Sequence, residues 1–434
     1  MFAFCLLAGV LLLKRNTPAN RIFTVGDDGM KSTPISGRER IVTIDIIRGF
    51  ALLGIFLVNM PAFHSPAFLE SHPDYSGVNY WLDLLFQMFV QTKFYTIFSF
   101  LFGLGFYIFM SRAEQKGLQI NRLFSRRLFA LLLFGVLHLV FLWFGDILHT
   151  YAITGFLLLL FYKRKPKTLL IWAFSLLFVF HAMVSAQFLA PASKLETINT
   201  EADQDRASML SEYVDMYENA PYGELVSYRL QTEMGRVAAN IPFTIITVLA
   251  MFLFGLYAGK KGVFKPDSQH LPLIKKVWWT TLVLSIPLVA LLAIFKTEVI
   301  DVGVYQQNAT YLFTSLSGLT LCFFYISSLT LMLRREFWQK LLRPLGYTGQ
   351  MALTNYLLQT FISVGIFLGL GYFGKVSLAE GTLICLAIYV AQTLFSYIWL
   401  KNFRFGPFEW LWRTLTYGYI QPMKKEEKSS GLNG

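Results

Sequence analysis

The chain has 434 residues, of which 55% are hydrophobic, 17% aromatic and 15% charged, and its formal net charge is +12. Soluble domains carry about 25% charged residues, so this chain has too little polar surface for a soluble protein of its length. Its 42 Phe and 21 Tyr residues also exclude a disordered chain, which would be poor in aromatic residues. The composition therefore predicts an integral membrane protein.

Residues 1–30 begin with an apolar run, MFAFCLLAGVLLL, that is too short to cross a membrane comfortably. Lys14 and Arg15 follow this run, whereas the basic residues of a secretory signal precede its apolar core. A polar, basic segment begins at Met30 and precedes the first long apolar stretch. We interpret residues 1–30 as a dispensable leader or as the product of an upstream start codon.

Ten stretches approach the roughly 20 apolar residues that a transmembrane helix requires. They predict an all-α, polytopic helix bundle, with five helices in residues 31–190 and five in 240–400. The stretches are 41–60, 80–110, 128–144, 151–162, 168–190, 240–259, 277–295, 310–333, 350–372 and 378–400. The fourth is short, and we expect its helix to start at Gly145.

The pentapeptide FLFGL occurs at 100–104 and again at 252–256, each time at the inner end of a predicted helix. Because Phe, Leu and Gly are abundant throughout the chain, we interpret the repetition as coincidence. We therefore predict no internal repeat from it.

Basic residues mark one face of the predicted bundle. If the residues before Ile41 lie inside, the inner loops and the two ends of the chain carry 30 of the 38 Lys and Arg residues, against 6 in the outer loops. Cytoplasmic loops are enriched in Lys and Arg, so we predict that both termini are cytoplasmic. The positive charge thus indicates topology and attraction to anionic membrane lipids, and we expect no nucleic-acid partner.

The first predicted helix carries two ionisable residues, Asp45 and Arg48. An ionisable group at the bilayer centre costs about 2.5–3.5 kcal/mol on insertion scales, so each one requires a partner or a function. At this spacing the two side chains share one face of a helix. Either they form an intrahelical ion pair, with Arg48 extending to the inner headgroups, or Arg48 faces the bundle and binds an anionic group entering from the cytoplasm.

Further polar side chains are predicted at the outer ends of the first four helices. Imidazoles beside a carboxylate suit proton transfer, because histidine titrates near neutral pH and a carboxylate fixes its tautomer. We therefore predict one outward-opening cavity between these helices. The residues that line it are His64, Lys93, His138, Asp146 and His149, with Asn59 and Tyr151 nearby.

Each of these residues also has a purely structural interpretation. Asp146 can cap the fourth helix by accepting backbone N–H bonds. His138 can be a core histidine bonded to a neighbouring carbonyl, and His64 a solvated loop residue. A metal site is not predicted, because the histidines lack an HExxH-like spacing and none of the three cysteines is near them in the sequence.

Residues 191–239 form the longest predicted outer loop, with nine acidic residues against four basic ones. Apolar residues at helical spacing predict an amphipathic surface helix over 206–218. This stripe consists of Leu210, Tyr213, Val214 and Tyr217. The segment is either a lid over the cavity or a solvated loop.

Residues 401–434 are predicted to form a cytoplasmic interfacial helix and a tail. Trp410 and Trp412 are typical of residues that anchor a helix at the membrane interface. Glu409 and Arg413 have the spacing of a helical ion pair.

Five segments of the chain resemble the bacterial membrane family typified by YeiB, which is designated a domain of unknown function. They are IDIIRGFALLGIFLVNM (44–60), KFYTIFSFLFGLG (93–105), RRLFALLLFGVLHLVFLWFGDILHTYAITG (126–155), GQMALTNYLLQT (349–360) and FGPFEWLWRTLTYG (405–418). Gln350 stands in the fourth segment where the pattern leads us to expect an arginine. Asn355, in the same segment, is assigned to the predicted substrate- or cofactor-binding residues.

That family is similar, at a distance, to the transmembrane acyltransferases that include the lysosomal heparan-glucosaminide acetyltransferase. The shared pattern comprises Asp45, Arg48-Gly49 and Asn59 in the first helix, followed by a lumenal-side histidine for which His64 is the candidate. The resemblance implies a protein of the bacterial cell membrane that transfers an acyl group from acetyl-CoA, or a similar acyl-CoA, to a small-molecule acceptor. That acceptor would be an extracytoplasmic sugar or envelope component. Analogy with these relatives also implies a homodimer.

On this interpretation His64 or His149 deprotonates the acceptor, Asp146 orients the imidazole, and Lys93 or Arg48 stabilises negative charge. Two alternatives stay open: a proton-coupled secondary transporter of a small polar or anionic substrate, and a non-catalytic membrane partner. Transporters tend to bind substrates near the bilayer midplane, on interrupted helices of repeated halves. Here the polar residues lie near the membrane faces, which favours the transferase.

Overall fold

The computed structural model describes residues 41–67, 69, 75–265 and 269–425. Residues 1–30, which we interpret as a leader, lie outside these ranges, and so does the basic segment that follows them. Within the described ranges the regular elements are helices, apart from one isolated antiparallel bridge between Phe403 and Lys424. The prediction of an all-α, polytopic bundle is confirmed.

The helices follow one another along the chain as α2 (Val42–His64), α3 (Gly77–Phe89), α4 (Lys93–Gln115), α5 (Ile120–Phe141), α6 (Leu148–Leu159), α7 (Pro166–Ala186), α8 (Ala192–Glu218), α9 (Tyr222–Tyr228), α10 (Met234–Lys261), α11 (Leu271–Lys296), α12 (Gln306–Met332), α13 (Glu336–Leu341), α14 (Arg343–Gln350), α15 (Ala352–Val364), α16 (Leu378–Asn402) and α17 (Pro407–Tyr417). Short 3₁₀ segments occupy Gln187–Leu189 and Gly303–Tyr305. Single π-helical turns occupy Arg229–Glu233 and Gly365–Gly369.

Nine helical stretches in the described ranges are long and apolar enough to cross a membrane. The fourth predicted span is instead α6, whose 12 residues extend only about 18 Å, less than a hydrocarbon core of about 30 Å. Its helix begins at Leu148 and not at Gly145, because the Asp146 carboxylate accepts the backbone N–H of His149 at 2.8 Å and starts the helix there. The chain is a multi-spanning membrane protein, and the cytoplasmic placement of its termini stays a prediction.

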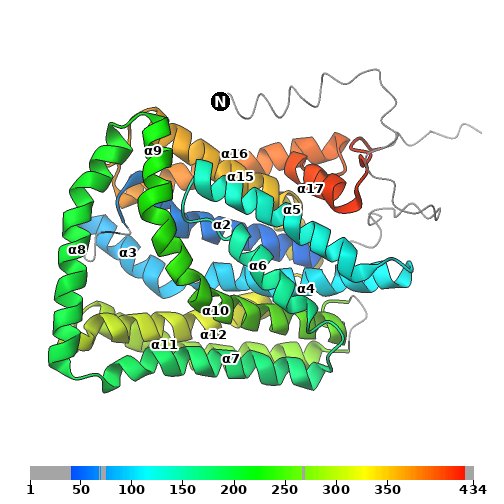
Figure 1. Ribbon diagram of the computed structural model, residues 1–434. Helices are drawn as coiled ribbons and strands as arrows, with labels where there is room; N and C mark the ends of the chain where they lie inside the picture. The colour runs from blue at the N-terminus through cyan, green and yellow to red at the C-terminus, as the bar shows by residue number, and fades with distance from the viewer. Residues whose placement is uncertain (1–40, 68, 70–74, 266–268, 426–434) are drawn as a thin grey trace, which may run out of the picture.

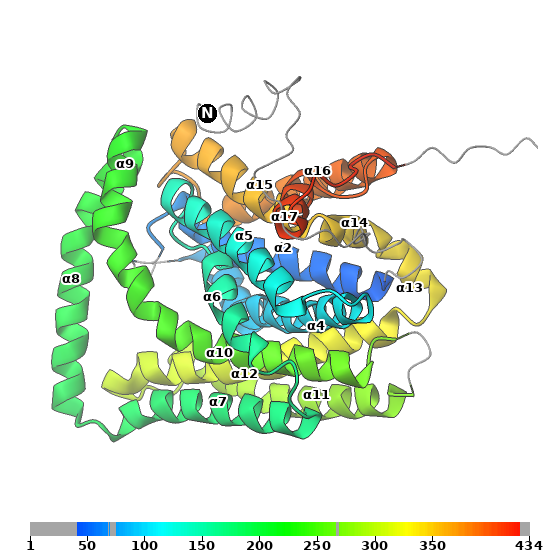
Figure 2. The same cartoon turned by 45° about the vertical axis from the view of Figure 1, so that its right-hand side comes forward.

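The spans lie side by side along a common direction, and α8 runs across one end of the bundle (Figure 1). The helix predicted over 206–218 is the second half of α8. Tyr213 and Tyr217 of α8 pack with Leu69 and Phe373, which come from two connections at this end. The opposite end carries α14, α17 and the turn between α4 and α5 (Figure 2).

The two copies of FLFGL pack against each other where α4 and α10 cross. A Cβ atom on Gly103 would lie 2.0 Å from the carbonyl oxygen of Phe252, and one on Gly255 would lie 1.9 Å from that of Phe100. The rings of Phe102 and Phe252 stack with centroids 4.5 Å apart. These reciprocal contacts give the two copies equivalent places in one close crossing. The absence of an internal repeat stays a prediction.

Candidate functional site

His138, Asp146 and His149 form one buried group, termed here the histidine–aspartate cluster. His138 lies on α5, Asp146 in the connection to α6, and His149 in the first turn of α6. Nδ1 of His138 lies 2.9 Å from Asp146 Oδ1, and Nδ1 of His149 lies 2.8 Å from Asp146 Oδ2. Gly135 permits this approach, because a Cβ atom there would lie 2.4 Å from the backbone nitrogen of His149.

The shared carboxylate leaves the two imidazoles with different freedom. Because an ionised carboxylate only accepts hydrogen bonds, it favours the proton on Nδ1 of each ring and leaves each Nε2 as an acceptor. His149 Nε2 lies 3.1 Å from the hydroxyl oxygen of Thr150, which can donate to it. His138 Nε2 has no hydrogen-bond partner among the described residues. Of the two rings, His138 therefore holds the available basic nitrogen.

A cavity of about 540 Å³ lies beside the cluster, which is within the range of small-molecule binding sites. It follows α2 from Ile41 to Ile55, about 20 Å along the helix axis. Its exposed end includes Gln115 and Lys116, at the turn between α4 and α5. Its deep end includes Tyr356.

The exposed end of the cavity is at the turn between α4 and α5. This turn lies at the end of the bundle opposite α8 (Figure 2), which is the end that the basic residues predict to be cytoplasmic. This differs from the predicted outward-opening cavity. On the α8 side, the rings of Phe63 and Trp143 lie 4.5 Å apart, within a buried apolar cluster that also contains Phe56 and Phe367. Aromatic packing therefore closes the side on which the sequence predicted an opening.

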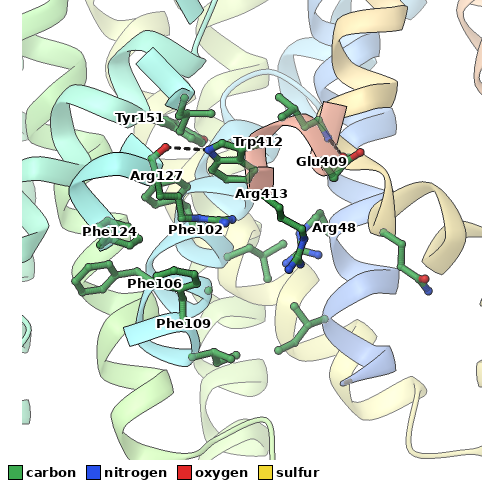
Figure 3. A pocket seen from close by; sticks show the side chains of 18 of the residues that line it. Arg48, Phe102, Phe106, Phe109, Phe124, Arg127, Tyr151, Glu409, Trp412 and Arg413 are labelled. Carbon is green, nitrogen blue, oxygen red and sulfur yellow. Dashed lines mark hydrogen bonds between the residues drawn. The ribbon is translucent and has the colours of Figure 1, made fainter. Parts of the chain in front are cut away.

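Basic side chains outnumber acidic ones in the lining of the cavity. They are Arg48, Arg112, Lys116, Arg127 and Arg413, against Asp45 and Glu409. Figure 3 shows Arg48 of α2 and Arg413 of α17 directed toward one region of the cavity. Arg127 of α5 lies 3.5 Å from the ring of Trp412, whose Nε1 donates to the Arg127 carbonyl at 2.8 Å. This end of the cavity is positively charged and suits an anionic ligand.

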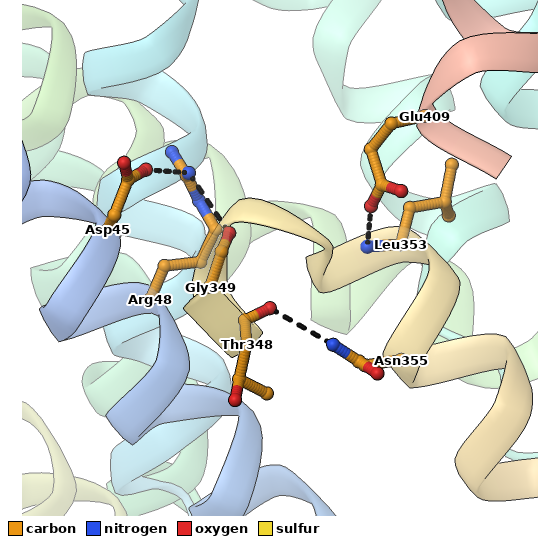
Figure 4. Close-up of polar contacts among 7 residues, drawn as sticks. All are labelled: Asp45, Arg48, Thr348, Gly349, Leu353, Asn355 and Glu409. Carbon is orange, nitrogen blue, oxygen red and sulfur yellow. Dashed lines mark hydrogen bonds and ion pairs between the residues drawn. The ribbon is translucent and has the colours of Figure 1, made fainter. Parts of the chain in front are cut away.

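The helix formed by α14 and α15 is interrupted beside the cavity, and charged side chains bind both of its open ends (Figure 4). At the end of α14, Arg48 Nη1 donates to the Gly349 carbonyl at 3.3 Å and to Asp45 Oδ1 at 3.0 Å. At the start of α15, Glu409 Oε1 accepts the backbone N–H of Leu353 at 2.7 Å. Cations at helix C-termini and anions at N-termini are favourable. Arg48 thus pairs with Asp45 and also lines the cavity; its extension to the inner headgroups and its binding of an anionic group stay predictions.

Lys93 stabilises another interruption, between α3 and α4. It is fully buried, and its Nζ donates to the Gln87 carbonyl at 2.9 Å and to Ser317 Oγ at 3.4 Å. Thr92, the residue before it, has a left-handed backbone with φ of 68°. A cation near the last carbonyls of α3 is a favourable contact, and no contact joins Lys93 to the histidine–aspartate cluster within the described ranges.

Three further predicted residues do not line the cavity. His64 is buried at the end of α2, with its ring centroid 5.7 Å from that of Phe367. Asn59 lies partly exposed on α2. Asn355 Nδ2 donates to the Thr348 carbonyl at 3.2 Å, across the interruption between α14 and α15 (Figure 4). Of the remaining predictions, Asp45, Arg48 and Tyr151 line the cavity, whereas the three residues of the histidine–aspartate cluster do not line it themselves.

The lining residues that were not predicted as site residues include Arg127, Tyr356, Glu409 and Arg413. Arg127 served only as a topology signal, and Glu409 and Arg413 only as an ion pair. All four fall within the segments that resemble the YeiB-type family. Their location in these segments is the sequence signal that could have identified them as candidate site residues.

Two family models match complementary parts of the chain. The model described as "Heparan-alpha-glucosaminide N-acetyltransferase, catalytic" matches residues 40–205, and the model described as "Protein of unknown function (DUF418)" matches 258–419. Of the residues that line the cavity, Arg48 and Arg127 lie in the first part and Tyr356 and Arg413 in the second, so the cavity is built from both.

Curated relatives match nearly the whole chain. It is 34% identical over 419 residues to the uncharacterized protein YxaH of Bacillus subtilis (strain 168), covering 91% of this chain and 98% of that protein. It is 28% identical over 387 residues to the uncharacterized protein YeiB of Escherichia coli (strain K12), covering 87% of this chain and 96% of that protein.

Proposed function

This chain belongs to the DUF418 family of YeiB-type membrane proteins, and from that premise we propose that it is an acyltransferase of the bacterial cell membrane. The donor is acetyl-CoA or a similar acyl-CoA, and the acceptor is a small sugar or envelope component on the extracytoplasmic side, which would reach His138 only when the packing of Phe63 on Trp143 opens. One observation carries the proposal: a cavity lined by five basic side chains ends at Tyr356, beside His138.

The two ends of the cavity fit the two ends of an acyl-CoA. Its phosphate groups would be held by Arg48, Arg127 and Arg413, because guanidinium groups bind phosphate oxygens in pairs. The deeper part is lined by apolar side chains such as Leu131 and Ile147, which suit the uncharged thioester end. The bound donor supplies an activated acyl group beside the histidine–aspartate cluster.

In this mechanism His138 is the general base. Its Nε2 accepts the proton of the acceptor hydroxyl or amine, while Asp146 keeps the Nδ1 proton in place and stabilises the imidazolium. The acceptor atom bonds to the acyl carbon, the carbon–sulfur bond breaks, and the proton on His138 passes to the departing thiolate. His149 holds the second carboxylate oxygen. His138 thereby takes the role that residue types alone gave to His64 or His149.

The test uses purified full-length protein in detergent with labelled acetyl-CoA. We expect thioester cleavage that His138→Ala abolishes. Arg413→Gln should raise KM for acetyl-CoA and leave kcat nearly unchanged, whereas Lys163→Gln, in the exposed connection after α6, should change neither. Protein that neither binds CoA nor cleaves acetyl-CoA contradicts the proposal.

A second function, proton-coupled transport of a small polar or anionic substrate, is favoured by the interruption between α14 and α15. Interrupted helices provide substrate sites in secondary transporters, and this one borders a cavity that is closed toward α8. Proton-coupled uptake into vesicles, without cleavage of acetyl-CoA, would support the transporter over the transferase.

A further inference from the structure

Tyr356 of α15 joins the cavity to the histidine–aspartate cluster. Its side chain lines the deep end of the cavity, and the residue is 6% exposed. Its ring centroid lies 5.2 Å from that of His138, with the ring planes inclined by 41°. Its hydroxyl also lies close to the Asp146 carboxylate and to the backbone of Ile147. Tyr356 therefore lies between the cavity in which a ligand would bind and His138, the proposed base.

The hydroxyl of Tyr356 is a buried donor that lies close to the Asp146 carboxylate and the Ile147 backbone but forms no hydrogen bond of good geometry with any described residue. An unsatisfied buried donor costs about 1–3 kcal/mol, so its retention requires a reason. Tyr151, the other tyrosine in the deep part of the cavity, differs: its Oη lies 2.8 Å from Ser99 Oγ and donates to the Tyr95 carbonyl at 2.9 Å. Of the two phenols, Tyr356 is the one available to a ligand.

The residues around Tyr356 hold its helix in place. Asn355, the preceding residue, donates through Nδ2 to Ser396 Oγ at 2.9 Å, and its carbonyl accepts a hydrogen bond of 3.0 Å from Gln392 Nε2. Glu409 caps the first turn of the same helix. The phenol is thus fixed before a ligand arrives, which is the condition for effective electrostatic stabilisation.

We propose that Tyr356 is a catalytic residue that donates a hydrogen bond from its hydroxyl to the acyl carbonyl oxygen, an inference that rests on the proposed acyltransferase function. When the acceptor atom bonds to the acyl carbon, the carbonyl electron pair moves onto its oxygen, and the Tyr356 O–H stabilises that charge. The electron pair returns as the carbon–sulfur bond breaks. Tyr356 keeps its own proton, and His138 carries the proton of the acceptor to the thiolate.

Tyr356→Phe tests the inference, because it removes the hydroxyl and keeps the ring against His138. We expect kcat for acetyl-CoA cleavage to fall about 100-fold while KM and the affinity for CoA stay unchanged. The matched control is Tyr389→Phe on α16, which removes a buried hydroxyl that donates to the Gly49 carbonyl at 2.8 Å, outside the cavity. That control should retain kcat.

A binding measurement separates this inference from the proposed function. S-acetonyl-CoA, a ketone analogue, presents the carbonyl without a thioester, and we expect Tyr356→Phe to weaken its binding and not that of CoA. If wild-type protein cleaves acetyl-CoA and Tyr356→Phe retains full kcat, the inference is overturned and the function stands. If wild-type protein cleaves no acetyl-CoA, the transferase function is contradicted. Binding of S-acetonyl-CoA then tests Tyr356 separately: equal affinity of wild-type protein and Tyr356→Phe for the analogue would overturn the proposed role of Tyr356.

Discussion

Glu409 Oε2 accepts a hydrogen bond of 2.5 Å from Thr354 Oγ1, although the two residues are 55 positions apart in the chain. Its other oxygen accepts the backbone N–H groups of Leu353 at 2.7 Å and Thr354 at 3.1 Å. The first N–H groups of a helix have no partner within it. A carboxylate of α17 therefore completes the start of α15, the helix that carries Tyr356.

Glu409→Ala should lower the free energy of unfolding by about 1–2 kcal/mol, the usual cost of losing a helix cap. Thermal unfolding in detergent measures the change. Glu336→Ala is the control, because Glu336 pairs with Lys340 at 2.7 Å on the exposed surface and such pairs contribute little. Equal melting temperatures for the two variants would show that Glu409 is not the cap on which α15 depends.

The pH dependence of stability should also report on Glu409, whose pKa is raised because burial disfavours its charged form. A carboxyl whose pKa is higher in the folded state binds its proton more tightly there than in the unfolded chain. Its contribution to stability is therefore greatest below the ordinary value of 4.5 and falls as the pH rises through the higher folded value. As the pH rises through this range, the free energy of unfolding of wild-type protein should fall relative to that of Glu409→Gln. A difference between the two free energies that does not change with pH would contradict this prediction.

Asp146→Asn should reduce acetyl-CoA turnover by about 100-fold or more, because the amide no longer enforces an Nδ1 proton on His138. KM should change little, since Asp146 does not line the cavity. Asp83→Asn is the matched control: Asp83 pairs with Lys296 at 3.3 Å near the surface, and its loss should leave turnover intact. If both variants turn over at the wild-type rate, the cluster has no catalytic role.

The sequence predicted the parts of the molecule that depend on local pattern. Hydropathy located the spans, because each apolar stretch lies in one continuous segment. His138, Asp146 and His149 were also grouped correctly, since a short connection forces α5 and α6 to be neighbours. Apolar length also marked the stretch after Asp146 as short, although its helix was expected to begin at Gly145 and to span the membrane.

The arrangement of the other site residues depends on how the helices are rotated and where they are interrupted, which hydropathy does not specify. Lys93 and His64 were expected beside the cluster, but Lys93 binds the end of α3 and His64 packs on Phe367. The cap on α15 joins Glu409 to residues 55 and 56 positions away. No local pattern predicts a contact over that distance.

The crossing of α4 and α10 should be sensitive to any side chain at Gly103. Its Cβ would meet a backbone oxygen at 2.0 Å, and overpacking of this kind costs about 1–3 kcal/mol. Gly255→Ala should cost a similar amount, because Gly255 has the equivalent place in the other FLFGL copy. Gly105→Ala, two residues along α4 with nothing within 4 Å, should not destabilise. Thermal unfolding compares the three, and a Gly103 variant as stable as the Gly105 variant would refute the close crossing.

The orientation of the cavity in the membrane determines which compartment supplies the acyl donor. Labelling of cysteines introduced at the two ends of the bundle can establish this orientation. Gln204 on α8 and Gln119 before α5 are both exposed. The helix α8 and the turn between α4 and α5 lie at opposite ends of the bundle (Figure 1). The distribution of Lys and Arg predicts that Gln119 lies inside. In a cysteine-free background, Gln204→Cys should therefore react with a membrane-impermeant maleimide in intact cells, and Gln119→Cys only after lysis. The reverse pattern would place the arginine-lined mouth outside, where acyl-CoA is absent, and would remove the physical basis for a CoA donor.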